Sequence, residues 1–375
     1  MFCLHHTTDG GGGELSGGAG CARGETGITM RAMITIFSAD HLLHQSPGEL
    51  IFGEFLPAFE KPERAELVLQ RVREVGLGEI RAPEVFPVSA ITRVHAPGLV
   101  ALLQSAQAEW EALGRSGAAY PYTWMSRGMR ADRVPAGLDG RLAYYSFDCG
   151  TPITKTSWQA IKSSVDVALS GVAVLAAGQR GAFSLCRPPG HHAGADHYGG
   201  YCFLNNAAIA AQKLLDEGAK RVAILDVDYH HGNGTQQIFY RREDVLLVSL
   251  HGHPDQEYPY LLGWEDETGE GAGEGFNLNF PLRWGTAWPE WSAALEAGLR
   301  RIAAYGADAV VVSLGVDTYK DDPISHFLLE HEHFTQMGAR IASLGKPVLF
   351  VMEGGYAVAE IGINAVNVLS GFEGA

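Results

Sequence analysis

Acidic residues and histidines follow directly on an apolar run in the segment "AILDVDYHHGNGT" at residues 223–235. A buried charge at the end of such a run is costly unless a partner compensates it. Side chains two residues apart on a strand face the same side, about 6.6 Å apart, so Asp228 and His230 can close on one ion. Asp317, which follows the apolar run "DAVVVSLGV", can complete the set. Two carboxylates and one imidazole, with positions left for water and substrate, suit a catalytic zinc ion, and ferrous iron accepts the same ligands.

Two further apolar runs also end in reactive side chains. The run "AFSLC" leads through "RPPG" to His191 and His192, and "PVLFVM" leads through "EGG" to Tyr356. Because ligands of parallel α/β sheets bind beyond the carboxyl ends of the strands, we expect these groups at one sheet edge. The glycines of the turns fit places where the backbone passes close to a ligand or needs a positive φ. They are Gly232, Gly234, Gly315, Gly354 and Gly355.

Asp226 faces the same side as Asp228, one step deeper in the same run. We do not expect it to touch the catalytic ion. A buried carboxylate needs a partner, and the sequence leaves two open. One is a histidine of the "GHH" turn, and the other is a monovalent cation held together with nearby backbone oxygens.

The elements that must position these residues alternate along the chain. Continuous apolar runs predict strands that are covered on both faces, which is typical of a parallel sheet flanked by helices. The predicted strands lie at "MITIFSADH" and at residues 182–186, 221–227, 245–250, 308–314 and 347–352. Helical periodicity predicts helices at residues 62–75, 97–113, 157–178, 205–217, 289–305 and 333–343. With no internal repeat and no linker after residue 33, we predict one α/β domain over residues 33–375.

Two segments fall outside this alternation. Residues 1–32 contain "DGGGGELSGGAGCARGE", which cannot bury enough surface to fix its backbone. We interpret them as a disordered Gly-rich extension, or as the product of a start codon placed upstream of Met30 or Met33. Residues 114–156 lose the pattern but carry tyrosines, a tryptophan, methionines and arginines, which are frequent in contact surfaces. We expect a functional segment there, and a floppy insertion is the alternative.

The composition limits the class of protein. With 46% apolar and 19% charged residues, the chain has ample material for a core. Its net charge of −15 disfavours nucleic acid as a partner and is compatible with a small cationic substrate. The five scattered cysteines form no CxxC pair, which favours reduced thiols in a cytoplasm. No apolar run reaches the roughly 18 residues of a membrane span, so we expect no membrane partner.

Several long segments make the chain resemble the histone deacetylase branch of the arginase/deacetylase superfamily, from about Met33 to the C-terminus. Within that branch it is most similar to the bacterial acetylpolyamine amidohydrolases. The segments are "FSLCRPPGHHAG", "GGYCFLNNAA", "AILDVDYHHGNGTQ", "VVSLGVDT", "DPIS" and "VMEGGY". The resemblance implies a single open α/β domain with an eight-stranded parallel sheet. It also implies zinc on Asp228, His230 and Asp317, an acid–base pair of His191 and His192, and Tyr356 as the hydroxyl that binds the developing oxyanion.

The resemblance further implies a structural monovalent cation, usually potassium, near Asp226. Its ligands would be the Ser249 hydroxyl and the backbone oxygens of Asp228, His230 and Leu250. A second monovalent site is implied around Phe239, Arg242, Val245 and Phe276.

Asn233 stands where some relatives of this branch have an aspartate. If Asp226 pairs with His191 and Asn233 with His192, the two imidazoles sit beside different partners. A carboxylate raises the pKa of an imidazole far more than an amide does. We therefore expect a protonated His191 and a neutral His192 that acts as the base.

The implied reaction is zinc-dependent hydrolysis of an acetyl amide to acetate and a free amine, and two substrate classes compete. An acetylated polyamine such as acetylputrescine, acetylcadaverine or acetylspermidine needs a narrow channel with carboxylates, whereas a peptide acetyl-lysine needs an open rim. Residues 114–156 favour the polyamine, because in the similar subgroup the matching loop packs on a second subunit and narrows the channel mouth. We thus expect a homodimer. The expected channel residues are Tyr201, Tyr258, Gly200 and Gly354, with Glu49, Asp139 and Asp148 as acidic candidates for the rim.

Two other readings remain in comparison. A metal-dependent binding module without activity predicts a missing ligand, histidine or tyrosine, and none is missing. Arginase-like hydrolysis at two manganese ions needs more carboxylates than the "DVDYHH" pattern offers. The acidic pattern of the subgroup near Gly150 is not fully reproduced in this chain, which leaves the preferred amine open.

Overall fold

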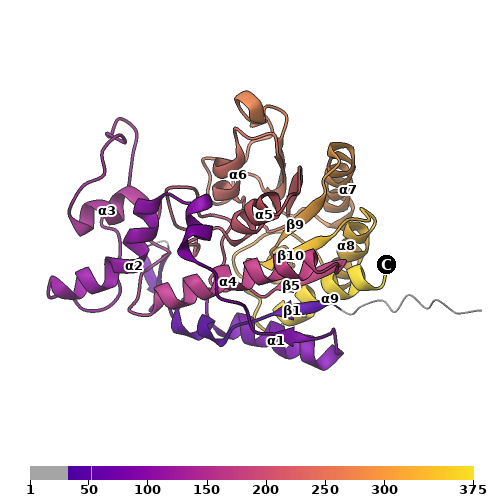
Figure 1. Cartoon of the computed structure of the whole chain (residues 1–375), viewed down its shortest axis with the longest axis horizontal. Helices are drawn as coiled ribbons and strands as arrows, with labels where there is room; N and C mark the ends of the chain where they lie inside the picture. The colour runs from indigo at the N-terminus through magenta and orange to yellow at the C-terminus, as the bar shows by residue number, and fades with distance from the viewer. Residues whose placement is uncertain (1–32, 52) are drawn as a thin grey trace, which may run out of the picture. The chain divides into compact units, whose positions relative to one another are not determined.

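The computed structural model describes residues 33–51 and 53–375, so the predicted extension of residues 1–32 lies outside the described residues (Figure 1). Eight parallel strands form one sheet in the order β4-β1-β5-β10-β9-β6-β7-β8. The strands are β1 (Ile34–Ile36), β4 (Ile80–Arg81), β5 (Gly181–Ser184), β6 (Val222–Asp226), β7 (Val245–Gly252), β8 (Asn277–Leu282), β9 (Ala309–Leu314) and β10 (Val348–Met352). The predicted α/β domain with an eight-stranded parallel sheet is confirmed.

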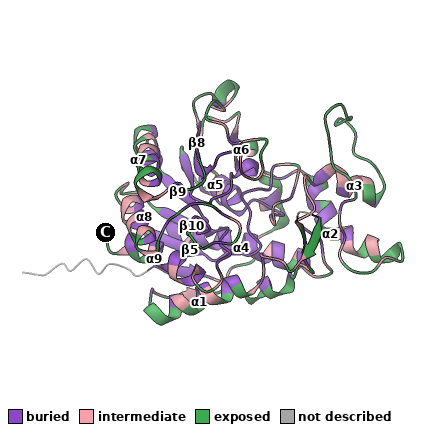
Figure 2. Cartoon of the chain, turned by 180° about the vertical axis from the view of Figure 1, so that it is seen from behind, coloured by how far each residue is buried: buried purple, intermediate pink, exposed green. Residues whose placement is uncertain are grey.

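Helices cover both faces of this sheet because alternate residues of its strands point to opposite sides. In β6, Ala223 and Leu225 belong to one core, and Val222 and Ile224 belong to another. The first core is closed by α1 (Glu63–Val75), α7 (Trp288–Tyr305), α8 (His331–Ala342) and α9 (Ile361–Glu373). The second is closed by α4 (Ser157–Ala176) and α5 (Asn206–Asp216). Figure 2 shows the middle strands of this sheet, such as β9 and β10, in the purple of buried residues.

The four middle strands β5, β10, β9 and β6 are neighbours in the sheet, and their register is level. Ser313 of β9 is the register partner of Val351 in β10 and of Asp226 in β6. The loops that leave these four strands therefore start at the same edge. These are the loops that carry the reactive residues of the sequence.

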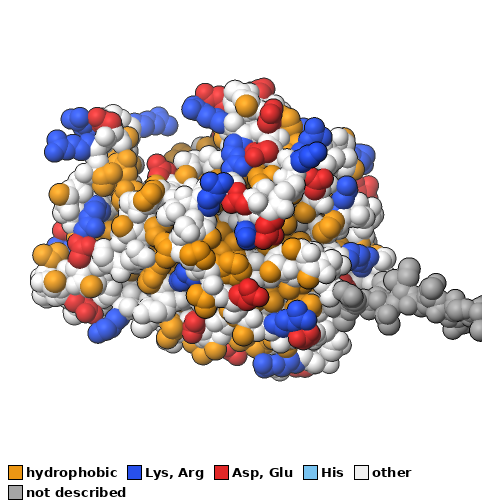
Figure 3. Space-filling model, viewed as in Figure 1, with side chains coloured by type: hydrophobic (Ala, Val, Ile, Leu, Met, Phe, Trp, Pro, Cys, Tyr) orange, Lys and Arg blue, Asp and Glu red, His pale blue; other side chains and the backbone are white. Residues whose placement is uncertain are grey.

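Residues 114–156 contain more regular structure than the sequence indicated. They include α3 (Leu138–Tyr145), whose Leu138, Leu142 and Tyr145 are buried in a third core shared with α2 (Pro97–Ala112). Eight residues are too few for helical periodicity to stand out in the sequence. The rest of the segment is open: Tyr122 is 93% exposed, and Lys and Arg side chains gather over this part of the molecule (Figures 1 and 3).

Several smaller elements were not predicted. They are β2 (Glu49–Ile51), β3 (Glu54–Leu56), α6 (Asn233–Phe239) and the 3₁₀ helices η1 (Ala39–Leu43), η2 (Val88–Arg93) and η3 (Gly271–Gly273). The sheet strands β4 and β8 and the long helix α9 were not predicted either. Among residues 33–51 and 53–375, one helix, α4, has the length and a mean hydropathy of 1.2 that would allow a membrane span, although polar residues interrupt it. Inside the fold, 78% of that window is buried, as in a core helix.

Candidate active site

Three buried side chains meet at the carboxyl edge of the sheet: those of Asp228, His230 and Asp317. Their potential ligand atoms all lie within 4.8 Å of one another. Nδ1 of His230 is 3.0 Å from Oδ2 of Asp317 and 3.5 Å from Oδ1 of Asp228. The residues predicted to hold a metal ion are thus brought together from the loops after β6 and β9.

The sequence predicted Asp228 and His230 on a strand. In the structure they lie in a turn beyond the end of β6. The strand ends at Asp226, whose Oδ1 accepts a hydrogen bond from the backbone N–H of Asp228 at 3.2 Å. Oδ1 of Asp228 in turn accepts one from the N–H of His230 at 2.9 Å. Each carboxylate accepts a hydrogen bond from the backbone N–H two residues later, a group that no longer pairs with a neighbouring strand. Such bonds are the reason why aspartates favour turns.

The surroundings of the Asp228 and Asp317 carboxylates fit a cation. A Cβ atom on Gly315 would lie 2.1 Å from Oδ2 of Asp228, and one on Gly354 would lie 2.5 Å from Oδ2 of Asp317. The glycines therefore leave a space around the carboxylates that side chains would fill. Within residues 33–51 and 53–375, no lysine or arginine pairs with either carboxylate. Because two buried carboxylates beside one imidazole need positive charge, the donor set fits a divalent metal such as zinc.

The tandem histidines have the two partners expected from the sequence. Nδ1 of His191 is 3.0 Å from Oδ2 of Asp226, and Nδ1 of His192 is 2.7 Å from Oδ1 of Asn233. Burial alone would lower the pKa of His191, but Asp228 and Asp226 raise this pKa to about 10. Burial and the neighbouring charge of His191 hold the pKa of His192 well below its usual value. The pair therefore carries one proton, on His191.

Tyr356 is buried, and its loop is fixed from two sides by residues that the sequence did not single out. Arg64 of α1 lies over the phenol ring at 4.7 Å from its centroid and donates through Nε to the Gly355 carbonyl at 2.6 Å. The N–H of Tyr356 donates to Oδ2 of Asp322 at 2.6 Å. Glu353 links this loop to the histidine turn, because its Oε2 accepts from the N–H of His191 at 3.2 Å.

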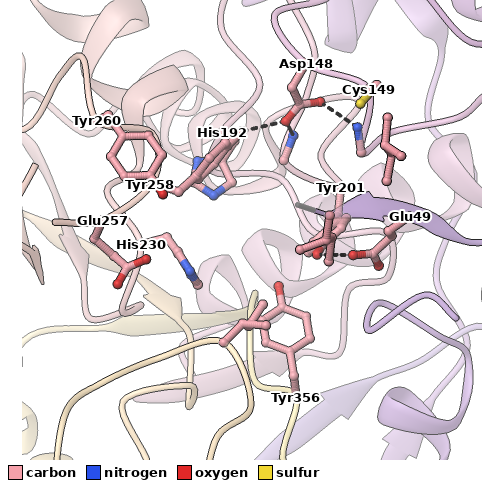
Figure 4. A pocket seen from close by; sticks show the side chains of 15 residues that line it. Glu49, Asp148, Cys149, His192, Tyr201, His230, Glu257, Tyr258, Tyr260 and Tyr356 are labelled. Carbon is pink, nitrogen blue, oxygen red and sulfur yellow. Dashed lines mark hydrogen bonds between the residues drawn. The ribbon is translucent and has the colours of Figure 1, made fainter. Parts of the chain in front are cut away.

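A cavity of about 360 Å³ opens onto these groups (Figure 4). It is lined by Glu49, Leu50, Ile51, Asp148, Cys149, Gly150, His192, Gly200, Tyr201, His230, Glu257, Tyr258, Tyr260, Ile324 and Tyr356. In Figure 4, Tyr201 and Glu49 lie across the cavity from His230 and Glu257. The hydroxyl of Tyr201 donates to Glu49 at 2.7 Å, and that of Tyr258 donates to Asp148 at 2.7 Å.

Most predicted channel residues line this cavity, and two do not. Asp139 lies on α3, where its half-exposed carboxylate pairs with both terminal nitrogens of Arg115. Gly354 lies next to the carboxylates of Asp228 and Asp317 and does not line the cavity. Its N–H donates to Oδ2 of Asp228 at 2.8 Å. Gly200 does line the cavity at a φ of 58°. The carboxylate that the sequence missed is Glu257, because no strand end or motif marked it.

The residues expected to hold monovalent cations lie as follows. Asp226 and Ser249 are register partners in β6 and β7, and both are fully buried. The Ser249 hydroxyl is also 2.7 Å from Nδ1 of His251. For the second set, the N–H of Arg242 donates to the Phe239 carbonyl at 2.9 Å, close after α6. Potassium at either place remains a prediction.

The parallel α/β fold and the buried Asp–His–Asp site are those of a metal-dependent hydrolase class, and comparison with known proteins shows the family. Residues 58–372 match the histone deacetylase domain, and the chain belongs to this family. The chain is 61% identical to acetylpolyamine amidohydrolase 2 of Pseudomonas aeruginosa over 342 residues, which cover 91% of this chain and 99% of that protein. It is 49% identical to acetylpolyamine amidohydrolase of Mycoplana ramosa over 342 residues, 91% and 100% of the two chains. The crystal structure of acetylpolyamine aminohydrolase from Burkholderia pseudomallei matches with a TM-score of 0.86 at 37% identity, covering 91% of this chain and 98% of that one.

Proposed function

We propose that residues 33–375 form a zinc-dependent amidohydrolase that removes acetyl groups from acetylated polyamines of the acetylputrescine, acetylcadaverine and acetylspermidine type. The charge of the cavity carries this proposal. Its 15 lining residues include the carboxylates Glu49, Asp148 and Glu257 and neither lysine nor arginine. A protonated amine is attracted to such a site, because opposite charges interact strongly where water is excluded. High identity to proteins named acetylpolyamine amidohydrolase supports the same substrate class.

The residues of the chain have the following roles in this proposal. A zinc ion held by Asp228, His230 and Asp317 would polarise the amide carbonyl and make a water molecule more acidic. His192 is neutral, and because its Nδ1–H donates to Asn233, its Nε2 is the atom that takes the proton of the attacking water. One of the two histidines then returns a proton to the leaving amine. The products are acetate and the free amine.

Tyr356 acts in the same step. Its hydroxyl donates a hydrogen bond to the oxygen that becomes negative as water adds to the carbonyl, an interaction whose loss typically costs about 10² to 10³ in rate. Arg64 and Asp322 keep the loop of Tyr356 in place, so that the hydroxyl is oriented before the substrate arrives. Tyr201 and Tyr258 form the walls between which the acetylated chain passes.

The alternative substrate is a peptide acetyl-lysine. The experiment measures kcat/KM of the zinc-loaded protein for acetylputrescine, acetylcadaverine and acetylspermidine against an acetyl-lysine peptide. The proposal expects the acetylated amines to be turned over best. A higher kcat/KM for the peptide contradicts it.

Two further parts of the proposal concern assembly and ions. We propose a homodimer that uses residues 114–156, whose Tyr122 and Met129 side chains are 93% and 53% exposed. We also propose a structural potassium ion near Asp226 and Ser249, with the backbone oxygen of Leu250 among its ligands. Sizing chromatography that gives only monomer contradicts the dimer. A melting temperature that does not change when potassium replaces a large organic cation contradicts the ion.

A further inference from the structure

The three carboxylates of the cavity differ in what they already bind. Resting on the proposed function, we infer that Glu257 is the residue that binds the free ammonium group of the acetylated amine. Glu49 and Asp148, the two rim carboxylates that the sequence suggested, instead position the tyrosines of the channel walls. In this inference, Glu257 is the residue that discriminates substrates by their charge and chain length.

Both oxygens of Asp148 already accept hydrogen bonds from the protein. Its Oδ1 accepts from the N–H of Gly150 at 3.0 Å. Its Oδ2 accepts from the N–H of Gly200 at 2.8 Å and from the hydroxyl of Tyr258 at 2.7 Å. An ammonium group would have to share an oxygen that already accepts a hydrogen bond from the protein. The carboxylate therefore holds the Tyr258 wall and the Gly200 turn in their relative positions.

Glu49 is engaged in the same way on the opposite wall. Its Oε1 accepts from the N–H of Phe59 at 2.7 Å, and its Oε2 accepts from the hydroxyl of Tyr201 at 2.7 Å. The residue is only 3% exposed. Loss of water around Glu49 and Asp148 raises the pKa of both carboxyls.

One carboxylate oxygen of Glu257 is held by the protein, and the other accepts no hydrogen bond from the described residues. Its Oε2 accepts from the hydroxyl of Tyr229 at 2.6 Å and from Nε1 of Trp284 at 2.9 Å, so the side chain is held in one orientation. Oε1 accepts no hydrogen bond from the described part of the chain, and no lysine or arginine there forms an ion pair with the carboxylate. In Figure 4 the carboxylate lies on the His230 side of the cavity. A substrate ammonium is the donor that would complete it.

Tyrosine rings line the same cavity as this carboxylate. Tyr258 and Tyr260 line the same cavity, and Tyr260 is 51% exposed. A cation close to the face of a tyrosine ring is attracted to it, and an alkyl chain packs against the same face. Glu257 lies at a fixed distance from the proposed metal ligands Asp228, His230 and Asp317. The number of carbons between the amide and the ammonium of the substrate therefore decides whether both groups can reach their sites at once.

The test separates charge recognition from catalysis. The zinc-loaded protein is given acetylcadaverine and N-hexylacetamide, in which a methyl group replaces the ammonium. Glu257→Gln is expected to lower the kcat/KM ratio of the charged to the neutral substrate at least about tenfold, mainly through KM, because a hydrogen bond to a charged group is lost. Glu265→Gln, an equal change of charge on an exposed residue outside the cavity, is the matched control and should keep the ratio.

Glu49→Gln and Asp148→Asn are expected to lower kcat/KM for both substrates alike. A ratio that survives in Glu257→Gln, or collapses in Asp148→Asn instead, overturns the inference. Where turnover is too slow, calorimetric dissociation constants of the two compounds show whether the variant has lost its preference for the charged one. Glu257→Asp provides a second variant: it keeps the charge but withdraws it by one methylene, so the preference should shift toward a longer acetylated diamine. A wild-type protein inactive on every acetylated amine contradicts the proposed function, whereas an unchanged ratio contradicts this inference alone.

Discussion

The hydroxyl of Tyr258 donates to Oδ2 of Asp148 across 110 positions of the chain, at 2.7 Å. One wall of the cavity is thereby tied to the segment that follows α3. The opposite wall is built in the same way, from Tyr201 and Glu49. Both walls thus consist of a tyrosine whose hydroxyl is held by a carboxylate from a distant segment.

Removing this hydrogen bond should loosen the channel wall. We expect Tyr258→Phe to lower kcat/KM for an acetylated amine by several-fold, chiefly through KM, because the ring is no longer fixed. Asp148→Asn should have a similar effect, and the double variant should be little worse than either single one. Residues in direct contact typically show coupling of about 0.5 to 3 kcal/mol, which a double-mutant cycle measures. Strict additivity of the two changes in free energy would show that the pair does not act as a unit.

Metal removal should abolish turnover. The zinc-loaded protein should hold close to one zinc ion per chain by elemental analysis and lose activity when a chelator removes it. Asp228→Ala should hold no zinc and show no activity, whereas Asp139→Asn, whose partner is Arg115, should retain both. Two ions per chain would favour the arginase-like reading, and full activity after chelation would contradict the mechanism.

The two histidines should not be equivalent. His192→Ala should lower kcat by about 10² to 10⁴, the usual contribution of a general base, with little change in KM. Asn233→Ala should have a smaller effect of the same kind, because the imidazole loses the partner that orients Nδ1. If His192→Ala turns over normally while His191→Ala is inactive, the assigned roles are wrong.

Stability should depend on pH through Glu60, a buried residue that pairs with Arg64, the arginine that holds the loop of Tyr356. Its Oε1 accepts from Nε of Arg187 at 2.7 Å and from Nη1 of Arg64 at 3.1 Å. Burial alone would raise the pKa of Glu60, but Arg187 and Arg64 lower it below its usual value. A carboxyl with a lowered pKa stabilises the fold above its unfolded pKa of about 4.3, and this contribution is lost as the pH falls through the folded pKa.

Glu60→Gln should therefore lower the free energy of unfolding by about 3 to 5 kcal/mol at neutral pH, since it leaves buried guanidinium groups unpaired. Urea denaturation at several pH values measures this difference. The gap between wild type and variant should narrow below about pH 4.3 as the wild-type carboxyl protonates. Glu79→Gln, which breaks an exposed pair with Arg81, should change nothing measurable, and a gap independent of pH would contradict the assignment.

The local sequence was sufficient for six of the eight strands of the sheet and for the reactive residues at its edge. Apolar runs such as "VAILD" and "AVVVSL" predict buried strands, and Asp228, Asp317 and Tyr356 follow such runs within a few residues. The elements that were missed lack a local signal. α9 is buried along most of its surface and shows no amphipathic period, and β8 carries Asn277 and Asn279 in a strand that is only partly buried.

Only the tertiary structure decided which polar groups meet. It placed Asp139 with Arg115 and away from the cavity, and it brought Arg64 onto the loop of Tyr356, 291 positions from the Gly355 carbonyl that it binds. Within the part of the chain that the structure describes, it also left Oε1 of Glu257 without a donor. These outcomes depend on how helices and loops pack across the sheet, because a hydrogen bond between distant segments has no counterpart in the periodicity of either one. The sequence alone therefore determined the fold and the reactive groups, and packing determined which carboxylates remain free to bind a ligand.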